Sequence, residues 1–157
     1  MNHPTYLRDT VLANIDAGAT RAGRSASDLQ VIVPAFIVPQ DDDEQRWRSF
    51  ARTQVAFYGS TPNYAFIFEQ LGHSDVTDRI RQHQKNGDIA GMAAEIPDEL
   101  LAEFIVTAPP ARLADAIHER YDGLATRVVN YFGGLDWARN PGSLERWADI
   151  CRDLTSA

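Results

Sequence analysis

The chain has 157 residues, of which 44% are apolar and 24% charged, and its formal net charge at pH 7 is −7. This composition can form a packed core, so we expect one folded domain spanning residues 1–157 rather than a disordered chain. No apolar run reaches the roughly 18 residues that a membrane span needs, and the N-terminus lacks a signal-peptide pattern. The acidic balance without a basic run disfavours nucleic acid as a partner. We therefore expect a cytoplasmic protein that binds neither nucleic acid nor membrane.

The first predicted element is a helix with one apolar face. Leu7, Val11 and Ile15 recur at four-residue spacing, which is the spacing of one helical face. Pro4 suits the first turn of this helix, and Gly23 suits its end.

Residues 29–38 form the first predicted strand. The run is short and rich in β-branched residues, and both its odd-numbered and its even-numbered positions are mostly apolar. This pattern is typical of a strand covered on both faces in a parallel sheet. Pro34 lies inside this run. Because proline has no N–H to donate to a neighbouring strand, we expect an edge, a bulge or a strand end there.

The central part of the sequence is predicted to be helical. An acidic cluster at residues 41–44 suits a helix N-terminus. The turn at residues 59–62 separates two helices, and polar, glycine-interrupted short helices follow to residue 102. Residues 104–106 are a short extended piece. The apolar positions of these helices and of the next one are Trp47, Phe50, Ala51, Val55, Tyr58, Tyr64, Ile67, Phe68, Leu71, Leu113, Ile117 and Tyr121.

Residues 126–132 form the second predicted strand, which Gly133 and Gly134 end. The last helix has a stripe of Leu144, Trp147, Cys151 and Leu154, and we expect Cys151 to be a buried structural residue. The predicted fold is therefore a helix-rich α/β fold with two parallel strands and six to seven helices. Two strands alone leave uncovered edges, which indicates part of a larger α/β fold.

Few residues offer chemistry. The four histidines lack metal-ligand spacing, and the acids at 41–43 are better explained as a helix cap than as a cation site, so we expect no metal. The most unusual stretch runs from Tyr58 to Tyr64, where two tyrosines enclose a turn rich in hydroxyl groups. This turn is either a binding turn, which offers N–H and hydroxyl groups to an anion or carbonyl, or an ordinary capped turn with packed tyrosines.

Three segments together resemble the luciferase-like monooxygenase superfamily. They are HPTYLRDTVLANIDAGATRAGRSASDLQVIVPAFIV (residues 3–38), QVAFYGSTPNYAFIFEQLG (residues 54–72) and FIVTAPPARLADAIHERYDGLATRVVNYF (residues 104–132). The resemblance implies that the two strands are the seventh and eighth of a (β/α)8 TIM barrel. It also implies the branch of the family that uses a deazaflavin coenzyme.

The chain departs from the family pattern in two ways. The family usually has Gly-Thr-Pro where this sequence has Ala108, Pro109 and Pro110, so the turn there is expected to differ. The family's chains are also about twice as long, and the resemblance covers only the last part of the barrel. The chain is therefore expected to be truncated, lacking an N-terminal barrel half.

Barrel enzymes carry their sites at the carboxyl ends of the strands. The resemblance thus implies that Tyr58, Ser60, Thr61 and Tyr64 face cofactor or substrate, together with residues 130–131, Asn130 and Tyr131. No catalytic residue is identified, because in this family FMN or a deazaflavin coenzyme carries the redox chemistry.

Two functions follow from these observations. The first is a flavin- or deazaflavin-dependent oxidoreductase or monooxygenase acting on a small organic substrate, with this chain incomplete on its own. The alternative is a non-catalytic, truncated α/β interaction module that self-associates into a homo-oligomer through its uncovered edges. A binding domain of another fold is a third alternative.

Overall fold

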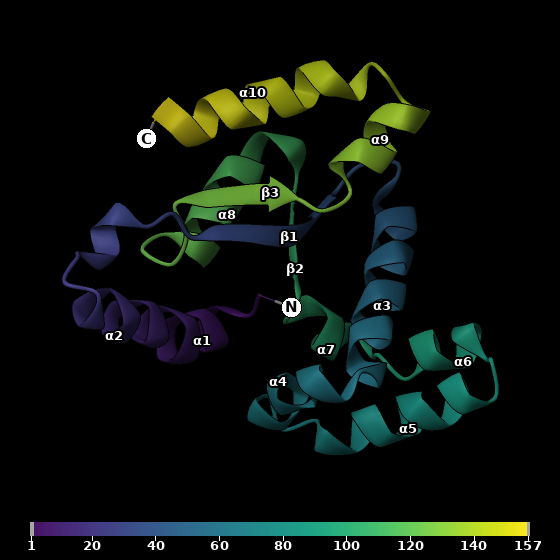
Figure 1. The fold of residues 1–157 in the computed structure, drawn as a ribbon. Helices are drawn as coiled ribbons and strands as arrows, with labels where there is room; N and C mark the ends of the chain where they lie inside the picture. The colour runs from purple at the N-terminus through teal and green to yellow at the C-terminus, as the bar shows by residue number, and fades with distance from the viewer. Residues whose placement is uncertain (1, 157) are drawn as a thin grey trace. The chain divides into compact units, whose positions relative to one another are not determined.

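The computed structural model describes residues 2–156 and is a helix-rich α/β fold, as predicted (Figure 1). The chain forms two compact units. The first, Asp42–Ile105, is here called the helical unit, and the second, residues 2–41 with 106–156, is called the sheet unit. Each unit is described by itself.

The sheet unit is built on a small parallel sheet of β1 (Ile32–Pro39), β2 (Ile105–Ala108) and β3 (Arg127–Asn130), in the order β2-β1-β3. β1 pairs with β3 in parallel, and Val33 lies opposite Val128. The predicted side-by-side arrangement of residues 29–38 and 126–132 is therefore confirmed. The number of strands needs correction from two to three, because the short extended piece after Phe104 pairs with β1 as β2.

Helices connect and cover these strands. In chain order they are α1 (Pro4–Tyr6), the π-helix η1 (Leu7–Leu12), α2 (Ala13–Arg21), η2 (Ala26–Asp28), η4 (Pro110–Arg112), α8 (Leu113–Tyr121), α9 (Gly133–Arg139) and α10 (Ser143–Ser156). The first three are continuous and form the helix predicted at the N-terminus.

One face of the sheet is covered along β1, and the other is exposed only at the first residues of that strand. Val33, Ala35 and Ile37 of β1 belong to a buried cluster that includes Leu113, Ile117, Trp147 and Ile150 from α8 and α10. On the opposite face, Ile32 is 52% exposed and Val129 is 44% exposed. Since paired residues of a parallel sheet point to the same side, Ile32 and Val129 mark an exposed apolar patch on this face. Further along the same face Phe36 and Val38 are buried.

Pro34 is the third residue of β1, which is the central strand, so it does not mark an edge strand as one of the expectations had it. Its backbone faces the side away from β3, since the neighbouring carbonyls of Val31 and Ala35 accept from the β3 segment. Its carbonyl oxygen accepts a hydrogen bond of 2.6 Å from the side-chain amide of Asn2 rather than from a strand. The missing N–H therefore removes no hydrogen bond to β3, which explains how a proline fits inside β1.

The buried face of α10 differs from the prediction. Trp147 and Ile150 are buried, whereas Leu144 is 53% exposed and Cys151 is exposed. The apolar stripe is therefore rotated relative to the predicted one, because Ser143 and Ile150 take the inward positions. The expectation that Cys151 is buried was wrong.

The helical unit contains α3 (Glu44–Ser60), η3 (Pro62–Tyr64), α4 (Ala65–Gln70), α5 (Ser74–Lys85), α6 (Ile89–Ala94) and α7 (Asp98–Ala102). Its core includes the fully buried side chains of Val55, Phe68, Ile80 and Leu100. A Cβ atom on Gly59 would lie 2.9 Å from the Phe68 ring, so glycine allows α3 to approach α4 closely.

Salt bridges join the polar surfaces of this unit. Arg79 binds Glu95 at 2.6 Å, and Arg52 binds Asp98. Among the described residues, 2–156, no helix has both the length and the apolar content to span a bilayer.

Candidate functional site

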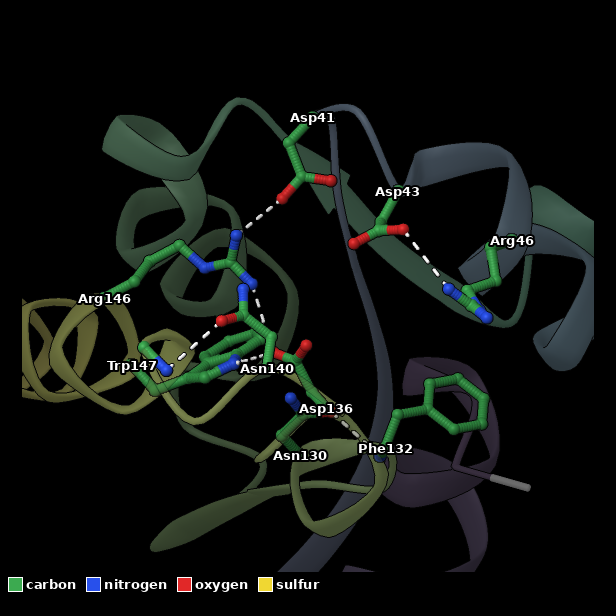
Figure 2. Close-up of polar contacts among 10 residues, drawn as sticks. Asp41, Asp43, Arg46, Asn130, Phe132, Asp136, Asn140, Arg146 and Trp147 are labelled. Carbon is green, nitrogen blue, oxygen red and sulfur yellow. Dashed lines mark hydrogen bonds and ion pairs between the residues drawn. The ribbon is translucent and has the colours of Figure 1, made fainter. Parts of the chain in front are cut away.

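The carboxyl end of the sheet brings together residues from four separate segments of the sheet unit (Figure 2). Asp41 follows β1, Asn130 ends β3, Asp136 lies on α9, and Arg146 lies in the first part of α10. The strands run parallel, so their carboxyl ends meet at one edge, which is where ligands bind in α/β folds. This edge is the candidate site.

A buried polar network holds the edge together. Asp136 is 4% exposed and accepts a 2.6 Å hydrogen bond from Trp147 Nε1 and a 3.1 Å bond from Arg146 Nη2. The other terminal nitrogen of Arg146, Nη1, lies 2.7 Å from Asp41 Oδ2. One guanidinium therefore connects the end of β1 to α9 and α10, and two carboxylates neutralise its charge.

The backbone turn after β3 is fixed by a side chain. Asn130 Oδ1 accepts a 3.0 Å hydrogen bond from the backbone N–H of Phe132. Such a turn, in which the side chain bonds the backbone two residues on, holds the residue between them outward. That residue is Tyr131, which is 41% exposed.

Three aromatic rings line this turn. Phe36 of β1 stacks with Phe132 at a centroid distance of 5.4 Å, and the Tyr131 ring stands edge-on to Phe36 at 5.0 Å. The buried pair forms a base, and Tyr131 presents its ring to solvent. The arrangement offers an aromatic surface beside a polar amide.

Some buried polar atoms near this edge lack hydrogen-bond partners among residues 2–156. They are Ser143 Oγ and Arg146 Nε in the first turn of α10, and Thr107 Oγ1 on β2. Gly134, at the start of α9, has open space where a side chain would be.

The other predicted site residues lie at the end of α3 in the helical unit. Tyr58 and Tyr64 stand edge-to-face with centroids 5.0 Å apart. Ser60 is buried, and its hydroxyl donates to the Phe57 carbonyl at 2.7 Å and accepts from Gln84 Nε2 at 2.9 Å. The hydroxyl of Thr61 is 3.5 Å from the same carbonyl. The structure therefore groups these four residues in one turn, and groups Asn130 with Tyr131 in the sheet unit.

Sequence reasoning missed the network around Asp136. Asp41 was interpreted only as a helix cap, and nothing in the sequence connects it to Arg146, which is 105 positions away. The available signal was weak: an acid, an arginine and a tryptophan within the last two helices. Across residues 2–156, no group of three or more histidine, cysteine or acidic side chains is arranged to hold a metal ion.

Comparison with known proteins adds independent information. The model of the luciferase-like monooxygenase family matches residues 2–127. An uncharacterised protein of Mycobacterium tuberculosis is 31% identical over 138 residues, which cover 84% of this chain and 41% of that protein. A protein of Archaeoglobus fulgidus named 5,10-methylenetetrahydromethanopterin reductase is 32% identical over 135 residues, which cover 82% of this chain and 39% of that protein. No solved structure matches the chain.

These similarities cover only part of each relative. The chain spans about two fifths of the length of the curated relatives it matches. At the level of the family, the matches support an oxidoreductase.

Proposed function

The chain belongs to the luciferase-like monooxygenase family, and we propose that it forms part of an oxidoreductase using reduced FMN or a reduced deazaflavin on a small organic substrate. The observation that carries this proposal is the family match over residues 2–127. The similar archaeal protein, named as a reductase, supports the same class of chemistry. Substrate, coenzyme and activity of the whole protein are part of the proposal.

The candidate site fits the planar ring system of such a coenzyme better than its phosphate. The exposed Tyr131 ring, standing on Phe36 and Phe132, suits the face of a planar ring system. A phosphate has weaker support at this edge, because Asp41 and Asp136 already neutralise Arg146. We therefore assign the carboxyl edge to the ring system and leave the phosphate to other residues.

Each residue then has a distinct role. The ring of Tyr131 contacts the coenzyme or substrate, and the amide of Asn130 holds the turn that directs Tyr131 outward. In the helical unit, Tyr58, Thr61 and Tyr64 offer an aromatic pair and a hydroxyl for binding, and the buried Ser60 positions their turn. None of these groups needs to transfer a proton.

The coenzyme supplies the redox chemistry when it is bound, as a donor of hydride in its reduced form. The protein binds and orients the reactants and limits the access of water. The buried aromatic rings at the carboxyl edge limit the access of water, since they leave little polar surface to which water can bind.

Fluorescence titration with FMN, and separately with the deazaflavin, tests this proposal. We expect saturable quenching at micromolar coenzyme, weaker for Tyr131→Ala and retained by Tyr131→Phe, because phenylalanine keeps the ring. Phe50→Ala is the matched control, since Phe50 is likewise an aromatic side chain that is 41% exposed, and it is not among the residues assigned to the site. No quenching by either coenzyme at high micromolar concentration contradicts an enzyme that works as this chain alone.

The exposed apolar patch of the sheet favours a second function, a self-associating interaction module. Ile32 and Val129 are exposed on one face of the sheet, and Trp137 on α9 is 48% exposed. Association of two copies through this apolar surface would bury it. Light scattering tests this function, and a monodisperse monomer over a wide concentration range contradicts it.

A further inference from the structure

The sheet unit contains a cavity of about 360 Å³ bounded by α8, α10 and the segment that leads into β3. This volume lies within the range of about 300–1,000 Å³ typical of small-molecule sites. Figure 1 shows these three segments next to one another. Ile117, Tyr121, Ala125, Val128 and Leu154 form an apolar lining.

The cavity is distinct from the candidate site at the carboxyl edge. Its lining includes Thr126, which precedes β3, and Arg127, which begins it, whereas Asn130 ends that strand. Val128 pairs with Val33, a residue of the buried cluster, so the cavity lies on the helix-covered face of the sheet. It is therefore also separate from the exposed apolar patch of Ile32 and Val129.

The charges around the cavity favour a positively charged group. α8 ends at Tyr121 and α10 ends at Ser156, so the carboxyl ends of two helices face this region, and such ends carry partial negative charge. Asp122, which directly follows α8, adds a carboxylate to the lining. Arg127 is also part of the lining, but it pairs with Ile32 in the sheet register, which directs its side chain toward the opposite face.

The remaining polar groups are already engaged. His118 Nε2 lies 3.2 Å from the Leu154 carbonyl oxygen and donates to it. The hydroxyl of Thr126 bonds to the backbone of Val31, and that of Thr155 donates to the Cys151 carbonyl at 3.1 Å. Burial raises the pKa of the Tyr121 phenol, so this side chain stays neutral at pH 7. Asp122 is the lining side chain with a full negative charge.

We propose that this cavity binds a small amphipathic amine, with an apolar ring or short chain against Ile117, Val128 and Leu154 and the ammonium group toward Asp122. The apolar walls provide most of the contact area, and the carboxylate together with the two helix ends selects a cation over an anion. This site is independent of the proposed coenzyme site and does not require it.

Cys151 provides a specific reporter, because it is the single cysteine of the chain, it is exposed, and it lines the cavity. We would measure the rate at which iodoacetamide, a neutral reagent, alkylates this thiol in the full chain. The probes are phenethylamine and 3-phenylpropionate, which share a phenyl ring and a short linker but carry opposite charges. The proposal predicts saturable protection by phenethylamine and little or none by 3-phenylpropionate.

Two variants and one control test the assignment. Asp122→Asn is expected to weaken phenethylamine binding about twofold to fivefold, the range for one partly exposed charge pair. Glu119→Gln makes the same change of charge on α8 outside the lining and should leave binding unchanged. Ala125→Trp fills the cavity and should abolish protection; if its circular dichroism shows that it does not fold, the comparison of Asp122→Asn with Glu119→Gln decides. Equal protection by both probes, no protection, or equal effects of these two charge variants overturns the proposal.

Discussion

Replacing Asp136 by alanine tests the buried network that organises the carboxyl edge. The substitution leaves the buried Trp147 Nε1–H without its acceptor at 2.6 Å, which costs about 1–3 kcal/mol. Arg146 keeps its contact with Asp41, so the loss of its second carboxylate adds at most about 1 kcal/mol. We therefore expect the free energy of unfolding to fall by about 1–4 kcal/mol.

Urea unfolding followed by tryptophan fluorescence and circular dichroism measures this change. With a urea m value of about 2 kcal/mol/M, the middle of the range for small proteins, the midpoint should fall by roughly 0.5–2 M while m stays constant. Asp149→Ala is the matched control. Asp149 is also an aspartate in one of the last two helices and is paired with an arginine, Arg152, but its side chain is 66% exposed. A cost for Asp136→Ala no larger than that of the control refutes the network as described.

The remaining predictions concern glycines and carboxylates. Gly91→Ala should be neutral or destabilising by up to about 1 kcal/mol, because its Cβ would collide with the Asp88 carboxylate that caps α6, and the lost cap offsets the helix propensity that alanine gains. Gly134→Ala has open space around it and should be neutral or stabilising by up to about 1 kcal/mol. Thermal melts compare the two variants, and an equal gain for both contradicts the role of Asp88. The Arg79 guanidinium holds the pKa of Glu95 below its ordinary value of 4.5, so this pair stabilises the fold above that pH, and the contribution is lost as pH falls through the lowered pKa. Melting temperatures between pH 7 and pH 3 should show a smaller acid loss for Arg79→Gln than for the parent, and parallel curves contradict this linkage.

The strand pair of the sheet unit could be predicted because its signal is local. Residues 32–38 are apolar at nearly every position, and the parallel partner at 127–130 has two adjacent valines, Val128 and Val129, between Arg127 and Asn130. β2 was missed as a strand because it has only four residues and is followed directly by Pro109. A segment this short becomes a strand only through its partner, β1.

The candidate site was less predictable, since it depends on tertiary contacts. Asn130 and Tyr131 lie in the last part of the strand predicted at residues 126–132, so their position near its carboxyl end could be inferred. The bonds of Asp136 with Arg146 and Trp147 depend on how α9 turns into α10. The exposure of Cys151 was mispredicted for the same reason, its dependence on tertiary contacts. A helical stripe can be drawn through Cys151, and only packing against α8 fixes which side of α10 is buried.

Hydrogen–deuterium exchange of the full chain, with and without FMN or the deazaflavin, tests the central claim most directly. The claim predicts slower exchange on binding in the turn from Tyr131 to Gly134 and at the end of β1, where the aromatic base and the Asp41 contact lie. Exchange that stays unchanged at saturating coenzyme, or slows only in segments away from the carboxyl ends of the strands, contradicts it.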